Sequence, residues 1–165
     1  MSAPHLLFER LVSAVPWQQH DRVLFDQTFR EPRLTAEYRN LKEAPEPALL
    51  DACHALSQRY GVVYDALWLN FYRNGQDSSA WHRDRPVRRL PQSIVPVLTL
   101  GATRRFLVKP YAGGKSVMFK PRSGDLIVMG GRAQVDWLHS VPKEPGITEP
   151  RVSINFQSSM QASLD

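Results

Sequence analysis

The sequence predicts a mainly β protein of the α+β class, in which helices from the first third of the chain pack outside a two-sheet antiparallel core. Two observations support this fold class. Before Gly61, apolar residues recur at three- and four-residue spacing, which is typical of amphipathic helices. After Gly61, short segments rich in branched and aromatic residues recur at roughly 8–12-residue spacing between turn residues, which favours a β sandwich or barrel.

The composition excludes several classes of protein. The 165 residues fit one domain, and a content of 42% hydrophobic and 22% charged residues excludes a disordered chain. The single cysteine, Cys53, excludes a scaffold held by internal disulfides. No apolar run approaches the ~20 residues of a membrane span, and no signal-peptide pattern is visible. We therefore expect a cytoplasmic monomer without a membrane partner, and its net charge of +5 is compatible with nucleic acid.

Two helices are predicted at the start of the chain. The first covers residues 4–15 and ends before Pro16, because the residue before a proline disfavours helical backbone. The second covers residues 47–60, begins with a proline and ends at Gly61, which suits a helix C-cap. Cys53 lies on the apolar stripe of the second helix, so we expect a buried rather than a reactive thiol.

Seven strands are predicted after the second helix. Turn residues such as Asn74-Gly75 and Gly113-Gly114 separate them. Residues 23–29 are expected to add one further strand at the edge. The seven strands cover residues 67–72, 94–100, 105–108, 116–119, 126–129, 135–139 and 152–156.

Three residues of the strand region form a candidate metal site. His82 and Asp84 are two residues apart, so in an extended segment their side chains point to the same face. His139 follows at the end of a predicted strand. Two imidazoles and one carboxylate on one face of a metal leave three positions free, which suits a non-haem Fe(II) that binds a co-substrate and O2. The remaining histidines lack such partners and are interpreted as non-ligands: His5, His20 and His54.

A second candidate site lies on the last predicted strand. Arg151 opens this strand, and Ser153 and Gln157 share its face. A buried guanidinium needs a carboxylate partner, which its planar fork can bind through two hydrogen bonds. Arg151 is therefore a candidate for binding a dicarboxylate co-substrate, and Asn70 and Tyr72 alternate onto one face of their own strand, where they can assist.

At these residues the chain resembles the AlkB family of Fe(II)/2-oxoglutarate dioxygenases. Several blocks match in a fixed order between Trp17 and Phe156, which is far more specific than any single motif. The blocks are Pro32-Arg33-Leu34-Thr35, Asn70-x-Tyr72-Arg73-Asn74-Gly75-x-Asp77, Trp81-His82-x-Asp84, Leu98-x-Leu100-Gly101-Ala102-x-Arg104-x-Phe106, Ser123-Gly124-Asp125-Leu126-x-Val128-Met129-Gly130-Gly131, Gln134-x-x-Trp137-x-His139-x-Val141-Pro142-Lys143 and Pro150-Arg151-x-Ser153.

The resemblance implies one domain over residues 1–165 with a double-stranded β-helix (jelly-roll) core and helices packed outside the major sheet. By this resemblance, residues 1–66 form N-terminal helices and a reduced nucleotide-recognition lid. Residues 67–157 form the core, and residues 158–165 form a tail.

The resemblance also implies the cofactors and the reaction. Fe(II) would be held by His82, Asp84 and His139, with 2-oxoglutarate and O2 as co-substrates. The implied reaction oxidatively dealkylates N-alkylated bases of DNA or RNA, single-stranded or flipped out of a helix, and releases succinate, CO2 and formaldehyde. The implied co-substrate contacts are Asn70, Tyr72, Arg151, Ser153 and Gln157, and the candidate substrate contacts are Tyr38, Arg83 and Arg85.

Three departures from the family pattern bear on activity. Gln157 stands where the closing strand of the family carries a second arginine, so we expect weaker 2-oxoglutarate binding. Arg85 follows the metal aspartate, where the family often has an acid that reads the damaged base, so either the substrate differs or another acid serves. The segment 38–45 is short, which predicts a more open lid.

Basic and aromatic residues near the expected mouth of the site are further candidates for contacts with nucleic acid. The basic residues are expected to form a phosphate-binding rim, or else a solvated surface charge run or arginines paired with acids. They are Arg83, Arg85, Arg88, Arg89, Arg104, Arg105 and Lys109. Three aromatic residues are candidates either for base stacking or for core packing: Trp17, Phe29 and Tyr38.

Two alternatives to nucleic-acid dealkylation remain open. The first is the same oxygenase chemistry on a protein or small-molecule substrate. The second is a degenerate, non-catalytic jelly roll that binds nucleic acid, for which Gln157 is the main support.

Overall fold

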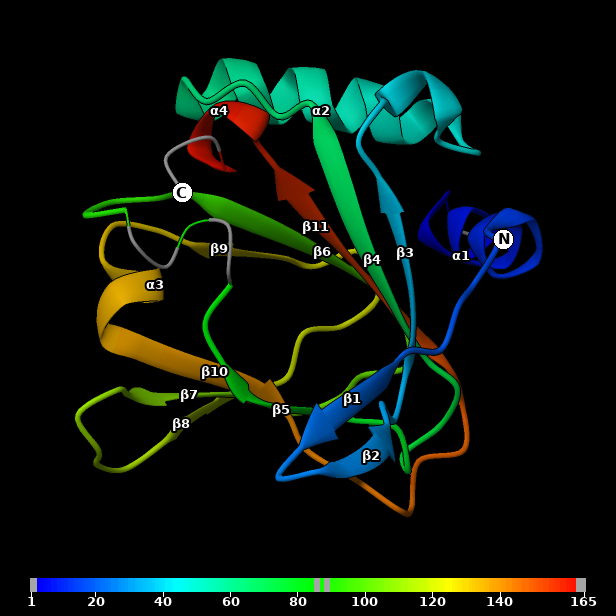
Figure 1. Ribbon diagram of the computed structural model, residues 1–165. Coiled ribbons are helices and arrows are strands. Elements are labelled where there is room, and N and C mark those ends of the chain that lie inside the picture. Colours follow the sequence, from blue (N-terminus) through cyan, green and yellow to red (C-terminus); the bar gives the residue numbers. More distant parts are fainter. Residues whose placement is uncertain (1–2, 85–86, 88–89, 163–165) are drawn as a thin grey trace.

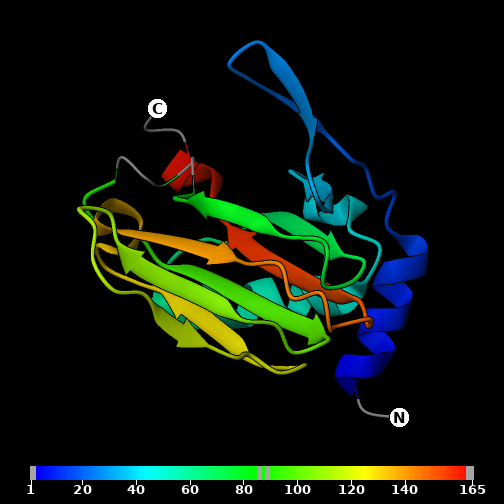
Figure 2. The ribbon, with the colours of Figure 1, turned by 90° about the horizontal axis from the view of Figure 1, so that it is seen from below.

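Two antiparallel β-sheets face one another in the computed structural model, which describes residues 3–84, 87 and 90–162 (Figure 1). The five-stranded sheet has the strand order β3-β4-β11-β6-β9, and the four-stranded sheet has the order β5-β10-β7-β8. A separate two-stranded hairpin, β1-β2, projects away from both sheets (Figure 2). The elements are α1 (Ala3–Ala14), β1 (Asp21–Leu24), β2 (Gln27–Arg30), β3 (Leu34–Tyr38), a 3-10 turn (Leu41–Glu43), α2 (Pro47–Tyr60), β4 (Ala66–Tyr72), β5 (Ser79–His82), β6 (Val95–Gly101), β7 (Phe106–Pro110), β8 (Val117–Phe119), β9 (Leu126–Met129), α3 (Ala133–Asp136), β10 (Trp137–Val141), β11 (Arg151–Gln157) and α4 (Ser159–Ala162).

The main hydrophobic core lies between the helices α1 and α2 and the five-stranded sheet. Leu11 of α1, Leu49 and Cys53 of α2, and Ile154 of β11 are fully buried in it. Each aliphatic side chain of this kind contributes roughly 1.5–3 kcal/mol when fully buried. Burial, together with the charge of Asp65, raises the pKa of the Cys53 thiol to about 11, in agreement with the expected unreactive cysteine. In the described part of the chain, no helix is long and apolar enough to cross a bilayer.

Strand β11 separates this core from the interior between the two sheets. Val152, Ile154 and Phe156 belong to the main core on the helix side. Because side chains alternate along a strand, Arg151 and Ser153 point to the opposite face, between the sheets. Strand β11 pairs with β4 on one side and β6 on the other, so the polar side chains of three neighbouring strands meet on this inner face.

Both predicted helices are confirmed. The first begins and ends one residue earlier than expected, and the second has the predicted bounds. Gly61 ends α2 with a φ of 67°, and its N–H donates to the Ser57 carbonyl, so the left-handed cap favours glycine. Six of the seven predicted strands are present as β4, β6, β7, β8, β9 and β11.

The predicted strand over residues 135–139 is wrong in its first half. The segment Ala133–Asp136 forms one helical turn, α3, and β10 begins only at Trp137. Arg132 Nε lies 2.7 Å from Asp136 Oδ2, an i,i+4 ion pair that spans this turn. Side chains four residues apart meet only when the backbone between them is helical, so the Arg132–Asp136 ion pair favours a helical turn. The local sequence pattern had instead favoured a strand.

The predicted edge strand over residues 23–29 is also wrong. This segment folds on itself as the β1-β2 hairpin, whose turn residues Phe25 and Asp26 have φ values of 50° and 61°. The edge of the five-stranded sheet is instead β3, and neither β3 nor β5 was predicted. Both are short strands of four or five residues that carry charged residues or histidine, which weakens their sequence signal.

Candidate active site

A histidine–aspartate–histidine cluster lies at the end of β5. His82 of β5 is the direct register partner of His139 of β10, and their ring centroids are 4.3 Å apart. Asp84 Oδ1 lies 3.8 Å from His82 Nε2 and 3.4 Å from His139 Nε2. The candidate ligand atoms all lie within 4.8 Å of one another, and no other such group of three occurs in residues 3–84, 87 and 90–162. The structure thus brings together the three residues that the sequence predicted as metal ligands.

Neighbouring groups orient the two imidazoles. His82 Nδ1 lies 2.7 Å from the carbonyl oxygen of Ala80. When Nδ1 carries the proton, it donates to this carbonyl and leaves Nε2 facing Asp84 as a ligand. The Phe106 ring stacks on His139, with the two centroids 5.6 Å apart. Histidines that bind a metal through one ring nitrogen typically donate the N–H of the other to a carbonyl or a carboxylate. The contact between His82 Nδ1 and the Ala80 carbonyl therefore fits a divalent metal ion.

The protonation states also suit a metal. Burial raises the pKa of the Asp84 carboxyl, but hydrogen bonding to His139, the charges of both histidines and the amide of Gln134 outweigh burial, so the net pKa is lowered. Burial and the charge of His139 lower the pKa of His82, to which the charge of Arg33 adds a smaller effect in the same direction. At neutral pH, Asp84 is therefore ionised and His82 is neutral, as ligation requires.

Gln134 holds the carboxylate of Asp84 in place, and its replacement by leucine is expected to lower the affinity for a divalent metal by about 10–100-fold. Gln134 is fully buried, its Nε2 donates to Asp84 Oδ2, and its Oε1 accepts from the Asp84 backbone N–H, both at 2.8 Å. Calorimetric titration of Gln134→Leu with Fe(II) or Mn(II) tests this, with the exposed Gln92→Leu as control. An unchanged affinity in a folded Gln134→Leu variant would contradict the assigned role.

Arg151 is a buried cation with unused hydrogen-bonding groups. Its Nη2 donates to Thr99 Oγ1 at 3.2 Å, whereas Nε and Nη1 have no hydrogen-bond partner among the described residues. The guanidinium carbon lies 5.3 Å from the ring centroid of Tyr72. Burial, and to a smaller degree the charge of Arg104, lowers the pKa of Arg151. A buried guanidinium with unused N–H donors on Nε and Nη1 fits an anionic ligand such as a carboxylate.

A row of polar side chains crosses the inner face of the five-stranded sheet beside Arg151. The register pairs Thr35 with Asn70, Asn70 with Ser153, and Ser153 with Thr99, and all four residues are buried. Asn70 Nδ2 donates to Ser153 Oγ at 3.2 Å. Four of the five predicted co-substrate residues therefore lie together on one sheet face: Asn70, Tyr72, Arg151 and Ser153.

Gln157, the fifth predicted co-substrate residue, lies at the other end of β11. It shares the face of Arg151 by alternation, is partly buried and pairs with Ala66 of β4. At about 3.3 Å per residue, its Cα lies roughly 20 Å along the strand from that of Arg151. Its contact with a co-substrate remains a prediction.

The two predicted substrate residues that the structure describes, Tyr38 and Arg83, have different surroundings. Tyr38 is buried in the main hydrophobic core, and its pairing with Leu67 puts it on the sheet face opposite to Thr35. The Arg83 guanidinium lies 4.2 Å from the ring centroid of Tyr111, and its Nη1 donates to the Val135 carbonyl. Arg85 lies outside the described residues.

The basic residues expected at the mouth of the site differ in their surroundings. Arg104 is not on the surface: it is 1% exposed, and its guanidinium donates to Glu144 and to three backbone carbonyls. Arg105 is paired with Glu144, and Lys109 Nζ lies 4.4 Å from the ring centroid of Trp81. The prediction that Arg104 belongs to a phosphate-binding rim is therefore wrong. Arg85, Arg88 and Arg89 lie outside the described residues.

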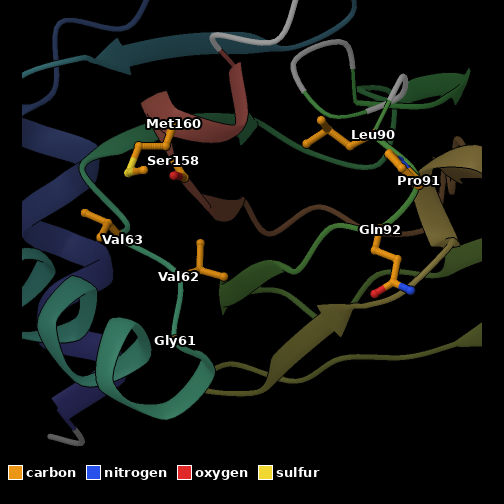
Figure 3. Close-up of a pocket in the computed structure, with 8 residues that line it drawn as sticks. All are labelled: Gly61, Val62, Val63, Leu90, Pro91, Gln92, Ser158 and Met160. Carbon is orange, nitrogen blue, oxygen red and sulfur yellow. The ribbon is translucent and has the colours of Figure 1, made fainter.

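A pocket of about 650 Å³ lies away from these groups, between the end of α2 and the end of β11 (Figure 3). Val62 and Val63 after α2, Leu90 and Met160 give it a largely apolar lining, to which Ser158 adds a hydroxyl. None of the predicted metal or co-substrate residues lines it, so it does not bear on the chemistry of the site.

Several residues that shape the site were not assigned a role from the sequence. Gln134 orients Asp84, and Asn70 Oδ1 accepts from Arg33 Nε at 3.0 Å and from Trp68 Nε1 at 3.1 Å. Gln134 and Arg33 lie within the blocks that match the AlkB family, which is the signal that could have marked them. Trp68 and Asn70 are two residues apart in β4, so their side chains point to the same face. Strand alternation could therefore have marked Trp68 from the sequence.

Comparison with known proteins agrees with this geometry. Residues 3–157 match the model of the 2OG-Fe(II) oxygenase superfamily. The chain is 34% identical to "Alpha-ketoglutarate-dependent dioxygenase alkB homolog 3" of Bos taurus, over 92% of this chain and 60% of that protein. It is 25% identical to "DNA oxidative demethylase ALKBH2" of Arabidopsis thaliana, over 91% of this chain and 60% of that protein. The chain thus spans about 60% of the length of these curated relatives.

Two solved structures share the fold. One is an oxidoreductase of the 2OG-Fe(II) oxygenase family from Burkholderia pseudomallei, with a TM-score of 0.59 and 14% identity over 92% of this chain and 76% of that chain. The other is a prolyl hydroxylase from Trichoplax adhaerens, in complex with a hypoxia inducible factor peptide fragment, with a TM-score of 0.60 and 13% identity over 96% of this chain and 78% of that chain. These similarities confirm the predicted jelly-roll fold.

Proposed function

Because this chain belongs to the 2OG-Fe(II) oxygenase superfamily, we propose that it is a 2-oxoglutarate-dependent Fe(II) dioxygenase that dealkylates N-alkylated bases of nucleic acid. The observation that carries this proposal is the joint presence of the His82–Asp84–His139 cluster and the buried guanidinium of Arg151. The similarity to AlkB-type relatives supports nucleic acid as the substrate.

The metal-binding half of the site would be supplied by the four-stranded sheet. His82 and His139 would offer Nε2 and Asp84 one carboxylate oxygen, which fits the two-histidine, one-carboxylate set of non-haem Fe(II) enzymes. When bound, Fe(II) supplies the oxidation of the alkyl group together with 2-oxoglutarate and O2. Gln134 and the Ala80 carbonyl keep the ligands in their binding orientation before the metal arrives.

The co-substrate half would be supplied by the five-stranded sheet. Arg151 would bind the distal carboxylate of 2-oxoglutarate through guanidinium N–H groups that have no partner among the described residues. Thr99 fixes the third guanidinium nitrogen, and the Tyr72 ring packs on the guanidinium, so its orientation is set in advance. Burial excludes water, which strengthens the interaction between the guanidinium and the carboxylate.

The overall reaction is balanced without a further reductant. One alkylated base, one 2-oxoglutarate and one O2 give the hydroxyalkylated base, succinate and CO2. For a methyl group, the hydroxymethyl base then releases formaldehyde and leaves the repaired base.

Substrate stimulation of 2-oxoglutarate turnover tests the proposal. The protein with Fe(II), 2-oxoglutarate and O2 is given single-stranded oligonucleotides that carry 1-methyladenine or 3-methylcytosine, or their unmethylated counterparts. We expect succinate formation to rise with the methylated oligonucleotides only. Succinate formation that no methylated oligonucleotide stimulates would indicate a protein or small-molecule substrate instead.

Restoring an arginine at position 157 is expected to lower the apparent 2-oxoglutarate constant by about tenfold. A hydrogen bond that involves a charged group is worth roughly 1.5–3 kcal/mol against about 1 kcal/mol for a neutral one, and arginine also reaches further along the sheet than glutamine. The measurement is the 2-oxoglutarate dependence of turnover in Gln157→Arg and, as a neutral control, Gln157→Met. Equal apparent 2-oxoglutarate constants for the wild type and Gln157→Arg would contradict a contact between residue 157 and the co-substrate.

A further inference from the structure

Strand β5 contains a β-bulge directly before His82, at the point where the strand pairs with β10 (Figure 1). The register pairs His82 with His139. The next pair is Ser79 with Val141. These two pairs are two residues apart in β10 but three residues apart in β5, so β5 carries one extra residue. Bulges of this kind are over-represented next to active sites, where they change the direction of a side chain.

The bulge turns Ser79 and His82 to the same face of the sheet. In a regular strand, residues three apart point to opposite faces. Ser79 is 6% exposed and is paired with Val141, which belongs to the buried hydrophobic cluster between the two sheets. The two intervening residues, Ala80 and Trp81, are both exposed. The extra residue of the bulge therefore lies at this exposed pair, and the Ser79 side chain stays inside.

The Ser79 hydroxyl takes the place of a backbone acceptor in the bulge. Its Oγ accepts from the buried N–H of Val141 at 3.0 Å. Without the bulge, the register partner of Val141 would be Ala80. The carbonyl oxygen of Ala80 instead lies 2.7 Å from His82 Nδ1. Because a carbonyl oxygen can only accept, this hydrogen bond needs the proton on Nδ1 and leaves Nε2 as the ligand nitrogen.

We propose that Ser79 is a positioning residue for the metal ligand His82. By accepting from the Val141 N–H, its hydroxyl stabilises the bulged register, and this register leaves the Ala80 carbonyl to hold His82 as the Nδ1–H tautomer. The inference rests on the proposed function, because it requires that His82 binds the metal through Nε2. Removal of groups that orient a metal-binding histidine typically lowers metal affinity by roughly 10–100-fold.

A purely structural role for Ser79 makes a different prediction. In that case the hydroxyl only satisfies a buried backbone N–H, and its loss lowers stability without any effect on the imidazole. The tautomer of His82 separates the two roles, because it depends on the contact with the Ala80 carbonyl and not on the stability of the fold.

NMR of the full chain without metal tests the proposal through the 15N chemical shifts of Nδ1 and Nε2 of His82, at a pH where the imidazole is neutral. Ser79→Thr and Ser79→Val introduce side chains of nearly the same shape, and only threonine keeps the hydroxyl. We expect the Nδ1–H tautomer in the wild type and in Ser79→Thr, and a mixture of both tautomers in Ser79→Val. Calorimetric titration with Mn(II) should give an affinity about tenfold lower for Ser79→Val than for Ser79→Thr.

Tyr64→Phe is the matched control for lost stability. The Tyr64 hydroxyl donates to the carbonyl of Ile94 at 2.9 Å, and Tyr64 lies in the main hydrophobic core. This control also removes a hydrogen bond between a buried side chain and the backbone, but it should change neither the tautomer of His82 nor the affinity for Mn(II).

Circular dichroism shows whether each variant is folded, and the smaller change Ser79→Ala replaces Ser79→Val if the latter is unfolded. The proposal is overturned if a folded variant without the hydroxyl keeps either the Nδ1–H tautomer or the wild-type affinity for Mn(II). An Nε2–H tautomer of His82 in the wild type would overturn it as well.

Failure of this inference is distinguishable from failure of the proposed function. If the wild type binds Mn(II) and forms succinate with Fe(II), while Ser79→Val matches it in tautomer and affinity, only the role of Ser79 is wrong. If the wild type binds no divalent metal, the proposed function fails, and the role of Ser79 fails with it.

Discussion

Asp84→Ala is expected to abolish metal binding and to lower 2-oxoglutarate turnover by about 1,000-fold or more. Asp84 is the group that both histidines face, with its Oδ1 3.4 Å and 3.8 Å from their Nε2 atoms. A bound metal ion stabilises the transition state by several kcal/mol, and each ~1.4 kcal/mol that is lost lowers the rate tenfold. Calorimetric titration with Fe(II) or Mn(II) measures the first effect, and succinate formation measures the second.

The fold is expected to survive this change, which makes the result specific. Asp84 follows β5 and belongs to neither hydrophobic cluster, so circular dichroism of Asp84→Ala should match that of the wild type. Asp51→Ala, an exposed change on α2, serves as the control and should leave metal binding and turnover intact. Metal affinity that survives in Asp84→Ala would exclude the His82–Asp84–His139 cluster as the metal site.

Arg151→Met is expected to raise the apparent 2-oxoglutarate constant by about 100-fold. Removal of one partner from a buried, hydrogen-bonded charge pair costs roughly 2–5 kcal/mol. In the ligand-free protein, however, the same change should raise the free energy of unfolding by about 1–3 kcal/mol, because Nε and Nη1 no longer remain buried without partners. The two effects have opposite signs, and calorimetry with 2-oxoglutarate and urea unfolding measure them separately.

Arg104→Met is the matched control for this prediction. Arg104 is as deeply buried as Arg151, but its guanidinium pairs with Glu144 at 2.9 Å and donates to three carbonyls. Its removal leaves Glu144 partly unpaired and should lower the free energy of unfolding by about 3–5 kcal/mol. A 2-oxoglutarate constant that is unchanged in Arg151→Met would show that another residue binds the distal carboxylate.

The parts of the site that follow from strand alternation could be predicted from the sequence. Arg151 and Ser153 were expected on one face of the last strand, and β11 places them there. His82, Asp84 and His139 were predicted as a cluster from residue chemistry and the family resemblance, although His139 is far from the others in sequence. These predictions succeeded because they depend on local geometry and on a pattern carried by several blocks.

The remaining parts depend on contacts that no local pattern encodes. Tyr38 was a candidate either for substrate contact or for core packing, and it was the register with β4, not a local pattern, that placed it in the main core. Arg104 was expected near the mouth of the site, in a phosphate-binding rim, in a solvated charge run or paired with an acid. It pairs with Glu144, but in the interior, where three backbone carbonyls also accept from it. Gln134 reaches Asp84 from fifty residues away and belongs to a helical turn that was predicted as a strand.

We propose that the His82–Asp84–His139 cluster and Arg151 together support the oxidation of an alkylated base by 2-oxoglutarate and O2. The most direct test is to load the protein anaerobically with Fe(II), 2-oxoglutarate and an oligonucleotide that carries 3-methylcytosine. O2 is then admitted, and succinate, formaldehyde and repaired base are measured in the same sample. We expect equal amounts of all three products in the wild type and none in Asp84→Ala. The absence of succinate in the wild type under any condition would contradict it.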